Sequence, residues 1–442
     1  MNIMNPYAPT AEVPILNPRR RRMLHALFDG SRQDFMMNLY KIAEEDLAVP
    51  QGNQIYSKRG FLTTMIEDRD SGELDMLKLL LTMSTDVLES LILNTIGSKF
   101  QLDPEFRKHF SKMENSGIYL NTVMSGAVPG KGLNGREWAV VTAMMSRYIR
   151  SRGVIITNNS TAAQRDDADE ASSIDNAFGS RPPLDIRNNE SYRGHRNWLN
   201  SGQTTETFRR NLTQRSNLAL DPTQRVRQTQ SPIEVGLSHD MATRIKCHHP
   251  ESGLRNTVKT WGLFLSCLSV AEIEFTVVSI PVLKVWNRSL IGKAEILITF
   301  LAGSSFDEGG FNAAPPGGTK SLSVPESLPN NKQEIFTEND TFSENLKVGE
   351  EDLSEKQKSL SILKDFDFDL MQTELDESKA KFEETRAARY QQKRDIRKAT
   401  GKIEELGVAG MAMITEASSR IERRNQFGDK LNDWLNKTTP AD

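Results

Sequence analysis

Hydrophobic positions recur at helical spacing through the first third of the chain. Asn17 and Pro18 form a typical helix start, with the asparagine as N-cap and the proline at the first helical position. A broader apolar face over residues 74–96 predicts a second helix, buried against its neighbours. With a third helix expected from Asn134, the pattern predicts a helical domain over residues 18–153.

Further along the chain the pattern changes to alternation between polar residues and β-branched or aromatic ones. Residues 272–277 and 295–300 alternate in this way, which predicts two strands joined by a turn at 286–289. We expect a small antiparallel sheet here. Because so few strands rarely stand alone, the sheet is expected to pair with another element or another subunit.

The C-terminal segment is highly charged and returns to helical spacing. One seven-residue repeat is apolar except at Arg389, but its companion positions are mostly polar or small, which makes a weak coiled-coil seam. Oligomerisation is the main interpretation and a monomeric helical hairpin is the alternative, since Gly401, Gly407 and Gly410 are expected to interrupt the helix. The predicted oligomerisation residues are Leu375, Phe382, Ile396, Ile403 and Leu406.

Together these patterns predict a multidomain, mainly α-helical chain with a small antiparallel β unit, C-terminal long helices or a coiled coil, and disordered linkers. The expected order is a flexible N-terminus at 1–17, the helical domain at 18–153, a disordered arginine-rich linker at 154–232, a small β-rich unit at 233–303, a disordered acidic linker at 304–350, a helical segment with coiled-coil character at 351–436, and a tail at 437–442.

The composition favours modules on flexible connectors over one large core. Only 37% of the 442 residues are hydrophobic, and the mean hydropathy is -0.51. The formal net charge of -3 conceals an acidic region at 326–355 and a basic interior stretch. Cys247 and Cys267 are too few for a disulfide framework, and no apolar run has membrane-spanning length. We expect a cytoplasmic protein, with the nucleus as an alternative location.

Between Lys131 and Lys246 every cationic side chain other than histidine is an arginine. Guanidinium groups form forked contacts with phosphate and stack on bases, so this composition indicates contact with RNA, or alternatively with DNA. The competing interpretation is a polar linker whose arginines balance the acids at 166–170. The predicted nucleic-acid-binding residues of this stretch are Arg193, Arg196, Trp198, Arg209, Arg210 and Arg215.

Four consecutive arginines stand at the start of the first predicted helix: Arg19, Arg20, Arg21 and Arg22. Cations at a helix N-terminus oppose the helix dipole, so the run carries a small cost unless something uses it. An anionic partner would do so, either nucleic acid or a nuclear-import receptor. The alternative is a solvated basic end.

No motif identifies a reaction, a metal or a cofactor. The glycine-rich segment 125–132 departs from the phosphate-loop pattern, and Cys247, His248 and His249 match no common zinc spacing. The acids and aromatics that alternate at 365–369 fit a packing stripe or a docking motif for a basic partner. Serines and threonines beside carboxylates in the acidic region make the chain a candidate phosphoprotein. We therefore expect a non-enzymatic protein without metal or cofactor.

This organisation predicts a modular accessory protein that binds nucleic acid and oligomerises. It is analogous to the replication or nucleocapsid cofactors of RNA viruses, and the analogy is one of organisation, because the chain has no family motif. The expected partners are RNA, further copies of the chain, and a polymerase or nucleoprotein. A self-assembling structural protein of the matrix, coat or scaffold type is the first alternative, and an enzyme with an unrecognised site is the second.

Overall fold

The computed structural model describes residues 7–49, 59–110, 116–179, 196–199, 201–238, 240–254, 256–317, 328–338, 340–364 and 368–438. The chain divides into two compact units, Met1–Lys356 and Gln357–Asp442. The described residues are mainly helical and contain one three-stranded antiparallel sheet. None of their helices combines the length and the apolar character that crossing a membrane requires.

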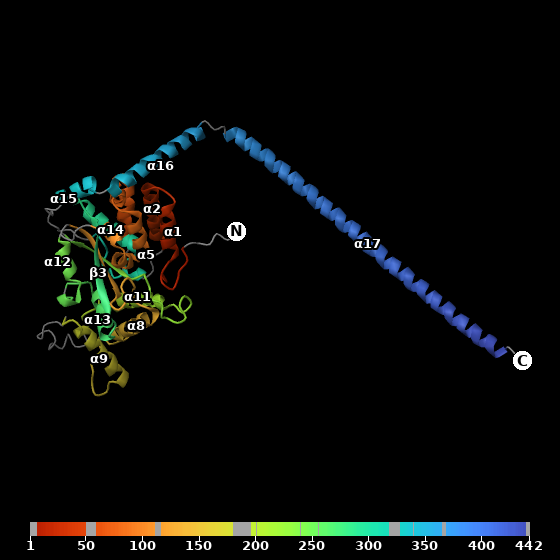
Figure 1. Ribbon diagram of the computed structural model, residues 1–442, viewed down its shortest axis with the longest axis horizontal. Coiled ribbons are helices and arrows are strands. Elements are labelled where there is room, and N and C mark those ends of the chain that lie inside the picture. Colours follow the sequence, from red (N-terminus) through yellow and green to blue (C-terminus); the bar gives the residue numbers. More distant parts are fainter. Residues whose placement is uncertain are drawn as a thin grey trace. The chain divides into compact units, whose positions relative to one another are not determined.

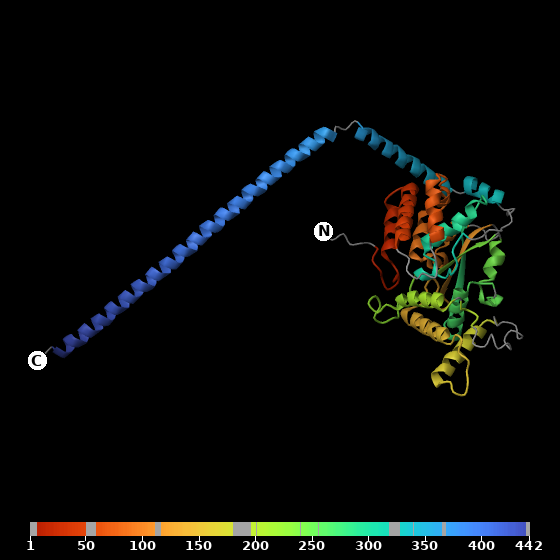
Figure 2. The same ribbon diagram turned by 180° about the vertical axis from the view of Figure 1, so that it is seen from behind.

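The sheet lies inside the first unit with helices around it (Figure 1, Figure 2). Its central strand, β1 (Gly117–Ser125), pairs with β2 (Ile233–Ser238) on one side and with β3 (Phe275–Lys284) on the other. Every residue of β1 is buried. A strand covered on both faces does not alternate between apolar and polar residues, which is why the sequence pattern predicted only helices in this part of the chain.

The helices before the sheet begin near the residues that the sequence marks. Asn17 caps α1 (Pro18–Phe28), because its side chain accepts a hydrogen bond from the backbone N–H of Arg20 at 2.9 Å. The helix predicted over 74–96 is divided, since Ser84 caps a new helix that ends at Asn94 with a φ of 57°. The other helices of this part are α2 (Arg32–Ala48), α3 (Arg59–Asp70), α4 (Asp75–Leu81), α5 (Thr85–Leu93), α6 (Ile96–Leu102) and α7 (Pro104–Arg107).

The segment 154–232, expected to be a disordered linker, contains helices in its described residues. Helices α9 (Ala162–Asn176) and α11 (Gly202–Thr213) both pack against α8 (Gly135–Arg150), and the short 3-10 helix η2 (Gln214–Ser216) follows α11. Phe208 and Leu212, four residues apart on α11, are fully buried. The structure differs from the prediction because a few apolar residues at helical spacing can anchor a segment whose average composition is polar.

The second predicted strand, at 295–300, is helical. It lies in α14 (Leu290–Ala302), and residues 286–289 lead into that helix. The first predicted strand, at 272–277, does overlap β3. So short an alternation cannot distinguish a strand from a helix that is buried on several sides. The remaining helical elements of this part are α12 (Met241–Lys246), η3 (Pro250–Ser252), α13 (Lys259–Val270) and η4 (Phe306–Glu308).

Elements from both halves of the first unit share one hydrophobic core. Trp138 of α8 stacks on Phe264 of α13, with 5.4 Å between ring centroids. Phe264 in turn lies 5.2 Å from Phe311, and Phe208 of α11 reaches the same ring at 5.5 Å. The helical domain and the β-rich unit that were expected to be separate therefore fold around a common core.

Helices also occupy described parts of the region expected to be an acidic linker, 304–350. They are α15 (Leu328–Gln333), the π-helical segment η5 (Glu334–Glu338) and the start of α16 (Asp340–Lys364). Asn345 of α16 donates hydrogen bonds to the carbonyl oxygens of Leu81 at 2.9 Å and Met83 at 3.1 Å. These bonds attach the start of α16 to the end of α4.

The second unit is dominated by α17 (Phe368–Thr438), a single uninterrupted helix. Breaks were expected at Gly401, Gly407 and Gly410, but the helix continues through all three. A glycine costs a helix about 1 kcal/mol relative to alanine, which weakens the helix without ending it. Coiled-coil pairing of this helix stays a prediction.

Candidate functional site

Three of the four arginines at the start of α1 bond to groups of the first unit. Arg20 is buried, and its guanidinium donates hydrogen bonds to the carbonyl oxygens of Ile92 at 2.6 Å and Ala302 at 2.9 Å and to the side chain of Asn94. Burial lowers the pKa of Arg20 to about 10. This arginine joins α1 to the ends of α5 and α14 and is not open to a phosphate in this conformation.

Two neighbours of Arg20 also have partners within the protein. Arg19 lies with its guanidinium 4.0 Å from the ring centre of Phe300 and forms an ion pair with Glu308. Arg22 forms an ion pair with Glu45 on α2. Carboxylates and carbonyl groups of the protein thus compensate much of the positive charge at this helix N-terminus. The sequence had suggested an anionic partner or a solvated basic end, and neither interpretation included partners within the protein.

Two of the predicted contact residues anchor the arginine-rich stretch to the core. Arg196 lies 3.8 Å from a carboxylate oxygen of Asp175. Trp198 is buried, and its ring leaves no room for a side chain at Gly262. A nucleic-acid base cannot stack on that indole without displacing α13. Arg193 lies outside the described residues.

The acids at 166–170 do neutralise nearby arginines. Glu170 of α9 lies 2.5 Å from Arg147 of α8, and Asp167 lies 2.9 Å from Arg150. The charge-balance interpretation therefore accounts for these two arginines, and it places their charge at the contact between two helices.

Three of the predicted arginines do come together, in a groove between α11, η4 and the N-terminal segment with a volume of about 870 Å³. Arg210 is exposed there, Arg209 pairs with Glu206 at 2.5 Å, and Arg215 is buried. The other polar lining groups are the amides of Asn17, Asn211, Gln214 and Asn217, the hydroxyl of Thr213 and the carboxylates of Asp307 and Glu308.

The chemistry of this groove is mixed. Burial lowers the pKa of Arg215 to about 9, and Asn211 donates a hydrogen bond to the carbonyl oxygen of Asp307 at 2.7 Å. One exposed cation beside carboxylates suits a single phosphate or a polar neutral group better than a continuous phosphate backbone. The groove is therefore at most a local contact point for nucleic acid.

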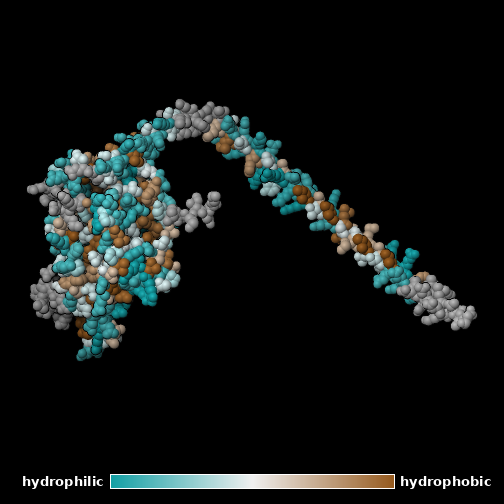
Figure 3. Space-filling model, viewed as in Figure 1, coloured by the Kyte–Doolittle hydropathy of each residue, from teal (hydrophilic) through white to brown (hydrophobic). Residues whose placement is uncertain are grey.

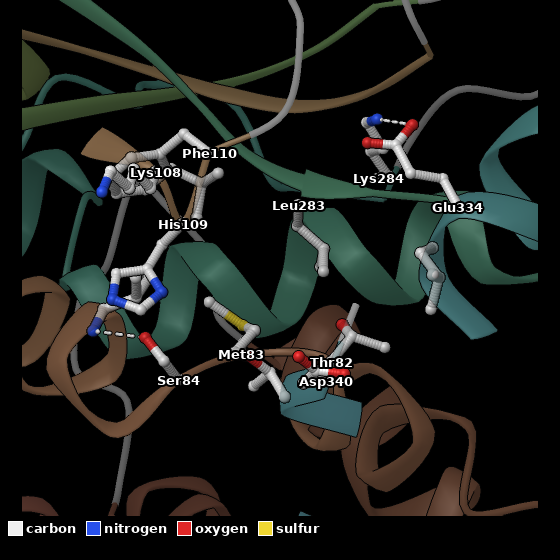
Figure 4. A pocket seen from close by; sticks show the side chains of 14 residues that line it. Thr82, Met83, Ser84, Lys108, His109, Phe110, Leu283, Lys284, Glu334 and Asp340 are labelled. Carbon is white, nitrogen blue, oxygen red and sulfur yellow. Dashed lines mark hydrogen bonds and ion pairs between the residues drawn. The ribbon is translucent and has the colours of Figure 1, made fainter. Parts of the chain in front are cut away.

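A second cavity, of about 390 Å³, lies beside the start of α5 and the end of β3. Figure 4 shows Lys284 and Glu334 at one end of it, joined as an ion pair, and His109 near Ser84 at the other end. The hydroxyl of Ser84 accepts a hydrogen bond from the backbone N–H of Val87 at 3.4 Å, as a helix cap does. The described lining groups thus fill structural roles and do not converge as acid, base and nucleophile.

A buried polar row crosses the sheet. Asn121 of β1 stands opposite Glu234 of β2 and Ser279 of β3 in the strand register. The amide of Asn121 donates to Glu234 at 2.6 Å, and its carbonyl oxygen accepts from the Ser279 hydroxyl at 2.6 Å. A shift of register by one residue would leave these buried groups without partners, so the row specifies how the strands pair.

The Cys247, His248 and His249 cluster diverges in space. Nε2 of His249 lies 3.2 Å from the Ser279 hydroxyl, whereas Nε2 of His248 lies 3.0 Å from the Tyr119 hydroxyl. The thiol of Cys247 lies 3.7 Å from a backbone carbonyl of its own helix. The three side chains therefore do not aim at one point where an ion could sit.

The histidine and serine beside the sheet do not form an activated nucleophile. Ser279 donates its proton to Asn121, so His249 does not accept that proton in this arrangement. Burial lowers the pKa of His248, which keeps its ring neutral near pH 7. Nδ1 of His248 lies 3.7 Å from a carboxylate oxygen of Glu234. Because the ring is neutral, this contact is not an ion pair.

One acidic cluster in the described part of the chain has the geometry of a cation site. Carboxylate oxygens of Asp68, Glu73 and Asp75 lie within 4.8 Å of one another. The Lys293 ammonium lies 2.9 Å from Asp68 and 2.7 Å from each of the other two. Burial lowers the pKa of Lys293, but hydrogen bonds to the three carboxylates raise it by more. The pKa of Lys293 therefore lies above its usual range. The lysine takes the position that a metal ion would need.

The apolar residues of α17 are exposed within the second unit, where they lie among charged residues (Figure 3). The predicted oligomerisation residues Leu375, Phe382, Ile396, Ile403 and Leu406 are 45–72% exposed. A denser apolar group follows them; it was not predicted from the sequence, although the uncharged run 406–414 signals it. This group consists of Val408, Met411, Met413, Ile414, Ile421 and Phe427, all exposed.

No protein-family model matches this chain, and neither the curated proteins nor the solved structures contain a match to it.

Proposed function

We propose that this is a non-enzymatic binding protein that self-associates through α17 and binds nucleic acid, in the manner of a replication or nucleocapsid cofactor. The observation that carries the proposal is the apolar stripe of α17, defined as Ile403, Leu406, Ile414 and Ile421, all exposed. At 3.6 residues per turn these side chains lie on one side of the helix, with the small residues Gly410 and Ala417 between them.

Such a stripe favours a partner. Full burial of each large apolar side chain is worth roughly 1.5–3 kcal/mol, and most helical stability in proteins comes from packing of an apolar face. A second copy of the chain fits as the partner, because its α17 presents an identical stripe. The uncharged run 406–414 supports this choice, since it brings no like charges together when two copies meet.

The test is the molar mass of the full-length protein, measured by size-exclusion chromatography with light scattering. Ile421→Lys places a charge on the stripe and is expected to convert an oligomer into a monomer. The matched control is Ser419→Lys, which adds the same charge on the other side of the helix and should leave the oligomer intact. A monomeric wild-type protein, or two variants that behave alike, would refute self-association through the stripe.

Nucleic-acid binding, to RNA or alternatively to DNA, is the second part of the proposal. Within the first unit it is supported by the groove, where Arg210 is exposed and forms no ion pair with a described residue. Self-association would multiply such weak contacts by avidity. A polymerase or nucleoprotein is proposed as the protein partner of the assembly.

Absorbance at 260 and 280 nm, recorded during the same chromatography at low and at high salt, tests this second part. A discrete oligomer that carries nucleic acid only at low salt is the expected result, because phosphate contacts weaken steeply as salt rises. A large assembly free of nucleic acid would instead favour a structural protein of the matrix, coat or scaffold type.

A further inference from the structure

A row of cations follows one side of α17 ahead of the apolar stripe. This basic row consists of Lys379, Arg386, Arg389, Lys393 and Arg397, all exposed. Successive members are separated by steps of seven, three, four and four residues. At 3.6 residues per turn these steps place the five side chains on one face of the helix.

Acidic side chains are largely excluded from this face. Residues 379–402 contain nine lysines and arginines but only three acids, in a chain whose net charge is -3. Glu384 and Asp395 lie on the other side of the helix from the row. Glu383 lies at the edge of the row, 3.3 Å from Arg386. Most of the excess positive charge is therefore gathered on one face of the helix.

This arrangement opposes helix formation unless an anion is present. Arg389 is followed by Lys393 and Lys393 by Arg397 at the four-residue spacing that brings side chains together, and each like-charged pair costs about 0.2–0.5 kcal/mol. None of these three forms an ion pair within the described part of the chain. An ordinary solvated helix face would interleave acids at this spacing, so the pattern indicates an external polyanion.

We infer that the basic row binds single-stranded nucleic acid, with phosphates along the cations and bases on the two aromatic residues beside them. Phe382 and Tyr390 are 66% and 62% exposed, and the Arg386 guanidinium lies 5.9 Å from the Tyr390 ring centre. Exposed rings next to cations bind single strands by stacking, which a duplex with paired bases does not permit. This inference rests on the nucleic-acid binding proposed above and locates it on α17.

The basic row also limits where α17 can self-associate. Phe382 and Arg389 occupy core positions of the predicted coiled-coil seam, and Arg386 and Lys393 flank that seam. Two copies packed along this part would bring their arginines together, which is unfavourable without an anion between them. We therefore assign the two activities to different segments of one helix, with nucleic-acid binding at 379–397 and self-association from Ile403 onward.

The test is fluorescence anisotropy of a labelled single-stranded RNA with the full-length protein at several salt concentrations. The row variant combines Arg389→Gln, Lys393→Gln and Arg397→Gln. The control variant combines Lys381→Gln, Lys398→Gln and Lys402→Gln, which removes the same charge from the other sides of the same helix. Circular dichroism and light scattering verify that both variants keep their helix content and oligomeric state.

The row variant is expected to bind at least about tenfold more weakly and to lower the slope of log affinity against log salt by about 2, at roughly 0.7 per lost phosphate contact. The control should keep nearly wild-type binding. Replacing Phe382 and Tyr390 by alanine should weaken binding without changing the salt slope, because stacking involves no counterion release. Single-stranded DNA and an RNA duplex of the same sequence identify which strands bind.

Each other outcome has a definite meaning. Equal losses in the row and control variants would show that bulk charge governs binding, and would overturn the inference. Wild-type binding in the row variant would place the contact elsewhere, so that nucleic-acid binding stands and the basic row does not. A wild-type protein that binds no probe would refute both the inference and the nucleic-acid part of the proposed function.

Discussion

The Arg215 guanidinium lies over the indole of Trp138, 5.2 Å from the ring centre, and both side chains are buried. Arg215 also donates a hydrogen bond to the carbonyl oxygen of Gln230 at 3.3 Å, and its own carbonyl oxygen accepts one from Gln228 at 2.6 Å. An arginine that the composition assigned to nucleic acid thus holds the chain after α11 against α8.

Arg215→Ala is expected to lower the free energy of unfolding by about 2–3 kcal/mol, because it removes a cation–π contact and a buried hydrogen-bond donor. Arg210→Ala, at an exposed position five residues earlier, should change it by no more than about 0.5 kcal/mol. Urea unfolding of the full-length protein measures both. Equal effects of the two substitutions would mean that the stacking on Trp138 does not stabilise the fold.

Lys293→Met is expected to destabilise the first unit by about 3–5 kcal/mol, since it leaves the buried carboxylate of Asp68 without its cation. The control is Lys108→Met, which removes an exposed ion pair with Glu105 and should cost less than about 1 kcal/mol. The difference in urea midpoint between the two variants is the measurement. A negligible effect of Lys293→Met would show that Asp68 takes up a proton or finds another partner.

Stability should fall as the pH drops below about 6.5, because burial lowers the pKa of His248 in the folded protein. In that range the unfolded chain binds a proton that the folded chain excludes, so acidification favours unfolding by up to about 1.4 kcal/mol per pH unit. His248→Gln should flatten this dependence, and His25→Gln, at an exposed position, should not. The measurement is the free energy of unfolding between pH 5 and 8. An unchanged pH dependence in His248→Gln would assign the effect to other groups.

Local signals predicted the elements whose ends depend on neighbouring residues. The cap of α1 at Asn17 is an example, because a side chain bonding to its own first turn needs no distant partner. The helical C-terminal segment is another, since its charges and spacing favour helix, although the expected breaks at Gly401, Gly407 and Gly410 are absent. The strand β1 could not be recognised, because a doubly covered strand looks like any other apolar run until the elements that cover it are known.

The candidate sites depended on tertiary structure even more strongly. Composition shows that a chain is rich in arginine, but it does not show whether a guanidinium faces solvent or a carbonyl group. Arg20 and Arg215 face the interior, whereas Arg389 and Arg397 on α17 are exposed. The helical spacing of the basic row is present in the sequence. The row was not recognised there because it overlaps the predicted coiled-coil seam.

The sequence by itself determined the helical character of most of the chain, the cap of the first helix and the faces of α17, because these depend on residues a few positions apart. Only the tertiary structure decided that described residues between Tyr7 and Leu328 share one core, and that predicted contact arginines such as Arg20 and Arg215 are buried. The physical reason is that burial is a property of contacts between segments distant in the chain. In the chain, Asn121 is more than a hundred residues away from both Glu234 and Ser279. Only strand pairing brings the three side chains together.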